Sequence, residues 1–467
     1  MKNNRLEIRA LTVMFNRKWF PLAVQIVFLA VFVLLIIGGL GANTSDMKFA
    51  RVLRNTNLPN LLVWSYWWPA VIAGAVFFGR VWCTVCPIEL VTSLLSMVGL
   101  KKKVPGWMRN GWLITIFYLA ILLVGIHTLA IHRVPLRMAL YMLVLFGLAV
   151  VFGLVFEKRA FCNHLCPVGP LLGLYGFCSP LEVRARDRKL CQTCPDRGCI
   201  APENYYRLTS RSCTSELYPA TLKHNRDCIL CGQCFNSCPF GNMGVFLRRP
   251  FKDFFTSTGI RLSGSQTFLI YLLSGFVLYE ILSEWKVTKD ILTWLPNSLG
   301  AKLGLSNPYI SGFTAAVVMF LVYPLLWWVV PAVVNKLAYP NVKVREYLKT
   351  IAVYFVPVLA GAHVLKSVLK TTSRIPYLKL SIEDPSGIDT AQSIISGALV
   401  LDKTIVNALQ PYITVFAILA LSAGTVVSLA ALWKNYRSRG GPSVIIPSTG
   451  ILIYGLLFLV ALYFWRL

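Results

Sequence analysis

Nine apolar runs, each of about 20 residues, restrict the folds that this chain can adopt. An α-helix of that length crosses the hydrocarbon core of a bilayer and satisfies its own backbone hydrogen bonds there. The sequence therefore predicts an α-helical polytopic membrane protein with about nine transmembrane helices. The runs are residues 20–40, 61–78, 111–131, 137–156, 266–283, 310–334, 350–369, 411–433 and 448–465.

The charged residues agree with this class of protein. Only 14% of the chain is charged, whereas about a quarter of a soluble domain is. The net charge of +27 is spread over many short loops, and no nucleic-acid-binding motif accompanies it. We therefore expect membrane lipid, and no nucleic acid, as a partner.

The positions of Lys and Arg predict the orientation. If the N-terminus is inside, 32 of the 46 basic residues fall in inner segments, as the positive-inside rule requires. No cleavable signal peptide is expected, because the run after Phe20 is long enough to remain as a span. The inner segments are residues 1–19, 79–110, 157–265, 335–349 and 434–447.

A compact cysteine run lies in the longest inner segment. Residues 228–238 read CILCGQCFNSC, and Pro239 follows. This spacing is typical of chains that hold cubane iron–sulfur clusters: three thiolates on one loop reach one cube, and the fourth reaches a second cube. A zinc site would more often show two separated Cys-x2-Cys pairs. All thirteen cysteines lie between Cys83 and Cys238, which favours metal thiolates in a reducing compartment over disulfides.

A looser copy of the run precedes it, so the segment offers eight cysteines, enough for two [4Fe–4S] clusters. By the crossing rule, Cys191, Cys194 and Cys199 share a cluster with Cys238. The second group is Cys228, Cys231, Cys234 and Cys213. A single cluster with a degenerate second site is the alternative. Cys178 has no partner in this scheme and is interpreted as a packed thiol.

Two further cysteine pairs end apolar runs and form an internal repeat. One is Cys83 and Cys86 in GRVWCTVCP, and the other is Cys162 and Cys166 in KRAFCNHLCP. Each has an arginine, an aromatic residue before the first cysteine, and proline after the second, which suggests a duplicated hairpin. The four thiols are candidates for a third cluster or another metal centre. Thiol redox chemistry and structural burial are the alternatives.

These motifs together resemble the membrane-bound polyferredoxins of bacterial respiration, such as the NapH, NosR and CcoG types, over about residues 60–250. The resemblance implies electron transfer between the quinone pool or a cytoplasmic donor and a redox enzyme across a bacterial or archaeal cytoplasmic membrane. It also implies other redox subunits as partners, quinone-linked or periplasmic. The first cysteine pair departs from the family, which usually has three residues between the two cysteines. Residues 41–60 are too short for the flavin-binding domain of the NosR type.

The expected division is a four-helix membrane part (1–177), a cytoplasmic ferredoxin-like cluster domain (178–265) and a five-helix membrane part (266–467). His127 and His363 lie within apolar runs, where ionisable residues are rare. They are candidate ligands of a b-type haem or proton acceptors of a quinone site, the alternative being histidines hydrogen-bonded within the bundle.

We expect the chain to relay electrons rather than convert a small substrate, because no nucleophile–base pair is visible. Two rivals remain: a copper-ion reductase that uses the cysteines of the repeat, and a redox-gated transporter with residues 266–467 as its pore. The pair Trp327-Trp328 is expected to anchor a span at the membrane interface.

Overall fold

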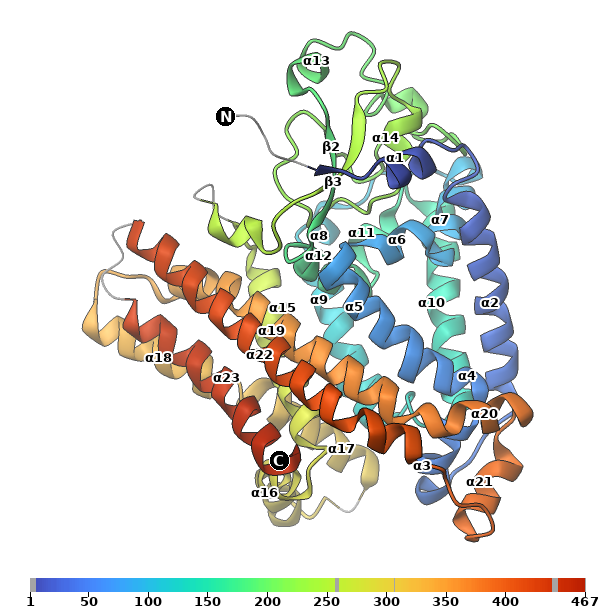
Figure 1. Cartoon of the computed structure of the whole chain (residues 1–467), viewed down its shortest axis with the longest axis vertical. Coiled ribbons are helices and arrows are strands. Elements are labelled where there is room, and N and C mark those ends of the chain that lie inside the picture. Colours follow the sequence, from blue (N-terminus) through green and yellow to red (C-terminus); the bar gives the residue numbers. More distant parts are fainter. Residues whose placement is uncertain (1–5, 257–259, 306, 439–443, 467) are drawn as a thin grey trace. The chain divides into compact units, whose positions relative to one another are not determined.

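The computed structural model describes residues 6–256, 260–305, 307–438 and 444–466 (Figure 1). It contains two compact units, and each is assembled from three stretches of the chain. Unit 1 comprises Met1–Ile37, Ala73–Ile114 and Leu140–Asp253. Unit 2 comprises Gly38–Ile72, Thr115–Ala139 and Phe254–Leu467. The division at residues 177 and 265 stays a prediction.

The chain is α-helical and rich in apolar helices, as the sequence predicted. Among the described residues, eight helical stretches are long and apolar enough to cross a membrane. The run at 111–131 corresponds to a shorter apolar stretch, Trp112–Thr128. The number of spans and their sidedness stay predictions. The eight stretches are Leu22–Leu40, Leu58–Phe78, Pro135–Val155, Gly264–Leu282, Tyr309–Ala338, Val344–Ser373, Thr404–Tyr436 and Ile445–Tyr463.

Unit 1 combines short helices with one small sheet. Four helices are divided between the two units. Along the chain, α2 (Leu22–Leu40) and α9 (Trp112–Ala120) run from unit 1 into unit 2, whereas α5 (Trp68–Phe78) and α10 (Pro135–Val155) run from unit 2 into unit 1. The short elements are α1 (Arg9–Phe15), α6 (Val81–Val85), α7 (Pro87–Val98), α8 (Gly106–Arg109), α11 (Ala160–His164), α12 (Val168–Gly176), α13 (Arg188–Gln192), η3 (Pro202–Asn204) and α14 (Gln233–Asn236). The one-turn helix η4 (Lys252–Phe255) ends this part.

The sheet is antiparallel, and its strands are β1 (Leu6–Glu7), β3 (Met243–Leu247) and β2 (Leu181–Ala185) in spatial order. Val183 pairs with Val245, and Leu6 pairs with Leu247. The sheet thus connects the N-terminal strand to the segments that flank the cysteine runs.

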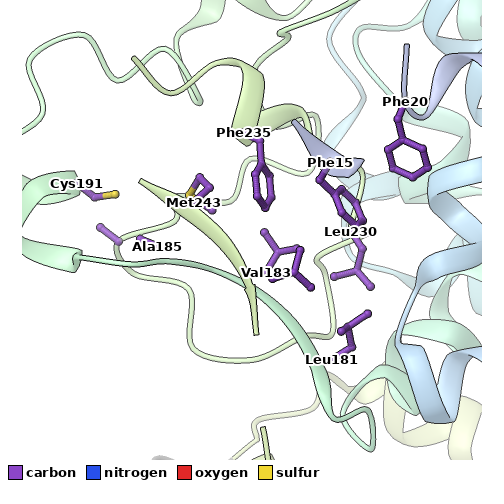
Figure 2. Packing of buried hydrophobic residues seen from close by; sticks show 11 residues of the cluster. Phe15, Phe20, Leu181, Val183, Ala185, Cys191, Leu230, Phe235 and Met243 are labelled. Atoms are coloured by element: carbon purple, nitrogen blue, oxygen red, sulfur yellow. The ribbon is translucent and has the colours of Figure 1, made fainter. Parts of the chain in front are cut away.

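An apolar core covers this sheet and supports the cysteine loops. Figure 2 shows Phe235 of α14 and Phe15 of α1 over the side chains of β2 and β3. Their two rings stack with centroids 5.7 Å apart. Since aromatic side chains bury large areas and pack in defined geometries, this core fixes α1 and α14 to the sheet.

Among the described residues, the regular elements of unit 2 are all helices. Its elements are α3 (Met47–Thr56), α4 (Leu58–Leu61), η1 (Leu62–Trp67), η2 (Ile121–Thr128), α15 (Gly264–Leu282), α16 (Lys286–Lys302), α17 (Pro308–Val317), η5 (Val318–Val322), α18 (Leu325–Ala338), α19 (Val344–Ser373), α20 (Ile375–Glu383), α21 (Ile388–Ile395), α22 (Thr404–Ser438) and α23 (Ile445–Arg466). A capping box formed by Ser263 and Gln266 starts α15, which satisfies N–H groups that have no partner within the helix.

The helices α19 and α22 pack closely because glycine lies at their contact. A Cβ on Gly361 would lie 2.6 Å from the Ala420 carbonyl oxygen, and one on Gly424 would lie 2.7 Å from the Pro357 carbonyl oxygen. The backbone N–H of Val358 also donates to Ser428 Oγ at 3.0 Å. Small residues let helix backbones approach in lipid, where the hydrophobic effect does not drive helix association.

The expectation for Trp327 and Trp328 was wrong. Their side chains are only 3% and 1% exposed, and each indole Nε1 donates to Ser274 Oγ at 3.1 Å. An indole N–H needs a partner when it is buried, and here one hydroxyl accepts from both. These residues join α18 to α15 within unit 2.

Candidate metal centre

The cysteine run at 228–238 folds as a loop that leads into α14. Leu230 and Gly232 both have positive φ, 56° and 71°, so the backbone turns sharply between the cysteines of this loop. Burial raises the pKa of the Cys234 thiol well above its ordinary value, and negative charge at Cys231, Cys228, Cys213 and Cys199 raises it further. Apart from Cys199, these cysteines are the group that the sequence predicted. We call this group the second quartet: Cys213, Cys228, Cys231 and Cys234.

The looser run forms its own group with the last cysteine of the compact run. Burial raises the pKa of the Cys199 thiol to about 11, and negative charge at Cys191, Cys238 and Cys194 adds to the rise. These thiols line one hollow of unit 1. The structure therefore brings together Cys191, Cys194, Cys199 and Cys238, which we call the first quartet.

The two repeated motifs have the same local geometry. A residue with positive φ, Gly79 (75°) or Lys158 (55°), comes first. Arg80 or Arg159 then caps a five-residue helix, α6 or α11.

The first cysteine of each repeated motif lies within this short helix, and the second lies just before a longer one. Cys86 is the N-cap of α7, whose first residue is Pro87. Cys166 precedes Pro167, the N-cap of α12. Proline suits a helix start, because its missing N–H is not needed there.

The four thiols of the repeat influence one another electrostatically. Burial raises the pKa of the Cys86 thiol well above its ordinary value, and negative charge at Cys162, Cys166 and Cys83 raises it further. Burial likewise raises the pKa of Cys166 to about 12. We call Cys83, Cys86, Cys162 and Cys166 the edge quartet.

The donors around the sulfurs fit metal-bound thiolates. Backbone N–H groups of Leu217 and Asn242 point at Cys213 Sγ and Cys238 Sγ, each at 3.4 Å. Such bonds stabilise a negatively charged sulfur. Four neighbouring thiolates repel one another unless cations neutralise them, and bound iron would supply that charge. Within the described ranges, no three Cys, His, Asp or Glu side chains lie close enough to hold a single metal ion.

A buried carboxylate organises the region between the edge quartet and the second quartet. Glu89 of α7 is 1% exposed. Its Oε1 lies 2.5 Å from Arg211 Nη2 and 3.3 Å from Arg159 Nε. Gln25 Nε2 donates to its Oε2 at 2.7 Å. Burial opposes its ionisation, yet Arg211 and Arg159 outweigh burial and hold the pKa of Glu89 below its ordinary value.

Arg159 connects two of the quartets. It is 2% exposed. Burial disfavours its charge, but negative charge at Cys162, Glu89, Cys83 and Cys231 outweighs burial and raises its pKa. Cys162 and Cys83 belong to the edge quartet, and Cys231 belongs to the second quartet. The charge on this guanidinium is therefore stabilised by cysteines of both quartets.

Two further contacts fix the quartets to one another. The hydroxyl of Thr84, which lies between Cys83 and Cys86 in the chain, donates to the Ile229 carbonyl oxygen at 2.5 Å. Arg80 Nη1 donates to the Arg226 carbonyl oxygen at 3.3 Å, and its Nη2 donates to Cys83 Sγ at 3.6 Å. The cysteine loop is thus hydrogen-bonded directly to the repeat.

The remaining candidate residues, Cys178, His127 and His363, do not belong to the three quartets. Cys178 is 1% exposed, in agreement with a packed thiol. His127 and His363 belong to unit 2, and aromatic rings connect them. The ring centroids of His127 and Phe320 are 4.9 Å apart, and those of Phe320 and Phe276 are 5.8 Å apart. The ring centroids of Phe276 and His363 are 6.2 Å apart.

The sequence did not single out Glu89, Arg211 or Phe15. One signal was available for Glu89, because it is the only acidic residue of an apolar helix that follows a Cys-Pro motif. No sequence pattern indicated a role for Phe15. Its Cδ1 lies 2.4 Å from where a Cβ on Gly232 would be, so only glycine fits in the cysteine loop there.

Known proteins match the same part of the chain. Residues 60–105 and 138–182 match the family described as 4Fe-4S binding domain, and these two ranges contain the repeated motifs. No solved structure matches the chain.

Three curated relatives are ferredoxin-type proteins. The chain is 34% identical over 100 residues to NapH of Escherichia coli, which is 21% of this chain and 32% of the relative. It is 28% identical over 184 residues to NapH of Haemophilus influenzae (36% and 61%). It is 34% identical over 146 residues to the methylamine utilization protein MauN of Paracoccus denitrificans (27% and 51%). The chain therefore spans between a third and two thirds of the length of these relatives.

Proposed function

We infer that this chain is an iron–sulfur electron-transfer protein of the NapH-type polyferredoxin family. We propose that it relays electrons between a quinol or cytoplasmic donor and a redox partner in or beyond the membrane. We further propose that the cysteine segment faces the cytoplasm, as the distribution of Lys and Arg favours. The first and second quartets would each hold a [4Fe–4S] cluster. The edge quartet would hold a third cluster.

The succession of the three quartets carries this proposal. Negative charge at Cys199 of the first quartet helps to raise the pKa of the Cys234 thiol of the second. The hydrogen bond from Thr84 to the Ile229 carbonyl oxygen supports the proximity of the second quartet and the edge quartet. A [4Fe–4S] group supplies one-electron transfer when it is bound. The chain's own residues would hold neighbouring groups at fixed separation.

The buried charges would tune this path. Arg159 and Arg211 place positive charge beside thiolates, and Glu89 neutralises part of that charge. Hydrogen bonds to sulfur and the local net charge are known determinants of the reduction potential of such clusters. The network therefore holds the second quartet and the edge quartet in one electrostatic environment.

The donor and acceptor ends are proposed on chemical grounds. A hydrocarbon core about 30 Å thick separates the two faces, so clusters on one side need a mobile quinol or a partner subunit to exchange electrons with the other side. His127 and His363 stay candidates for a quinone or haem b site.

Proteoliposomes containing the full chain test the relay. The clusters are reduced on the side of the cysteine segment, an oxidised quinone analogue is added, and the return of the oxidised absorbance is followed. We expect rapid reoxidation in the wild type and little in a Cys83→Ser/Cys166→Ser variant that retains the other two clusters. Equal rates in both would exclude the edge quartet from the path. The experiment is repeated with copper ions in place of the quinone analogue. If copper ions reoxidise the clusters and the quinone analogue does not, the result favours the metal-ion reductase.

A further inference from the structure

A polar cavity of about 350 Å³ lies within unit 2. Its wall is formed by α3, η2 and the residues after it, the end of α15, the start of α16, and the end of α19. Basic side chains dominate this wall. Besides Lys366, they are Arg51, Arg54, Arg133, Lys289, Lys370 and Arg374.

The wall has a large excess of positive charge. Its only carboxylates are Glu280 and Glu284, and both pair with Lys366. The Lys366 Nζ lies 2.6 Å from Glu284 Oε1 and 3.6 Å from Glu280 Oε2. Within the part of the chain that the structure describes, no carboxylate lies within ion-pairing distance of the other six cations.

Several donors in or beside the cavity have no hydrogen-bond partner among the described residues. They include the buried Nε atoms of Arg54 and Arg374 and the buried Nδ1 of His132. Burial lowers the pKa of Arg54 to about 10, and the charges of Arg374 and Arg133 lower it further. A polar group buried without a partner costs free energy, and clustered like charges add to that cost. An anion in the cavity would remove both costs.

We propose that this cavity binds a phosphate-type oxyanion, supplied either as free phosphate or by the headgroup of an anionic lipid. Guanidinium groups donate paired N–H bonds to such oxyanions, and lysine adds a point charge. The charged wall does not suit a quinone, because a quinone headgroup is neutral and pockets for neutral ligands are mostly apolar. The six cations also occur in segments expected on the outer side, where the positive-inside rule predicts few of them.

The test uses the full chain in nanodiscs, with thermal unfolding followed by tryptophan fluorescence. In phosphatidylcholine nanodiscs, inorganic phosphate is compared with chloride at equal ionic strength. A second set of nanodiscs contains phosphatidylglycerol. The variant is Lys370→Gln, and the matched control is Lys379→Gln, whose side chain is 86% exposed on α20. Lys379 does not line the cavity.

Phosphate should raise the Tm of the wild type and the control, with an apparent affinity at least about tenfold weaker in Lys370→Gln. If phosphatidylglycerol gives the shift instead, with the same dependence on Lys370, the ligand is a lipid headgroup. Arg51→Gln repeats the test if Lys370→Gln does not fold. Equal shifts in variant and control, no shift with either anion, or a shift with a water-soluble quinone alone would overturn the proposal.

Discussion

Replacing Glu89 by glutamine should destabilise unit 1 strongly, because the change leaves two buried guanidinium groups without their carboxylate. The Arg211 and Arg159 side chains contact the same Oε1 atom, and Arg159 and Glu89 are almost fully buried. Removing one partner of a buried ion pair costs about 3–5 kcal/mol. We therefore expect the free energy of unfolding to fall by about that amount.

The assay is denaturant unfolding of the purified full chain, followed by tryptophan fluorescence. Glu216→Gln is the control, because Glu216 is 63% exposed and pairs with Lys158 at the surface. An exposed pair contributes at most about 1 kcal/mol. If both variants lose the same stability, the reasoning about the buried network is refuted.

The effect of pH gives the same prediction a second readout. The folded pKa of Glu89 lies below its ordinary value of 4.5. Its stabilisation is therefore complete above pH 4.5 and is lost as the pH falls through the folded pKa. The stability difference between the wild type and Glu89→Gln should stay constant near neutral pH and shrink in acid. A difference that grows on acidification would contradict this sign.

Three further predictions concern single substitutions. Gly232→Ala should lose about 1–3 kcal/mol of stability, because Gly232 has a φ of 71° and the Phe15 ring lies against it. Gly241 has a φ of 57° but open space around it, so Gly241→Ala should lose less in the same denaturant assay. Ser274→Ala leaves two buried indole N–H groups unpaired, so the free energy of unfolding should fall by about 1–3 kcal/mol; no fall would show that water or another group replaces the hydroxyl. Cys178→Ala should keep the full iron and sulfide content, whereas Cys234→Ala should lose about a third of it; a loss of iron in the former would make Cys178 a ligand.

Local patterns predicted the helices well. The apolar run at 20–40 corresponds to Leu22–Leu40, and the run at 448–465 lies within Ile445–Arg466. The run at 350–369 marks only the centre of α19, Val344–Ser373, because polar residues extend the helix at both ends. Helix periodicity and hydropathy are local properties, so the sequence carries them directly.

Long-range partners were not predictable in the same way. Glu89 and Arg211 are 122 residues apart in the chain, and nothing in either segment specifies the other. Trp327 and Trp328 have the composition of interfacial anchors, but packing against α15 buries them. The cationic cavity likewise takes its wall from distant segments. Such features depend on tertiary packing rather than on local spacing.

Iron and sulfide analysis of the anaerobically purified full chain, with low-temperature EPR, tests the central claim most directly. Three occupied quartets predict about twelve iron atoms per chain, and about eight in the Cys83→Ser/Cys166→Ser variant. The variant should also lose one set of EPR signals while keeping the rest. A colourless, iron-free wild type would contradict the account, and a variant that keeps every signal would remove the third centre.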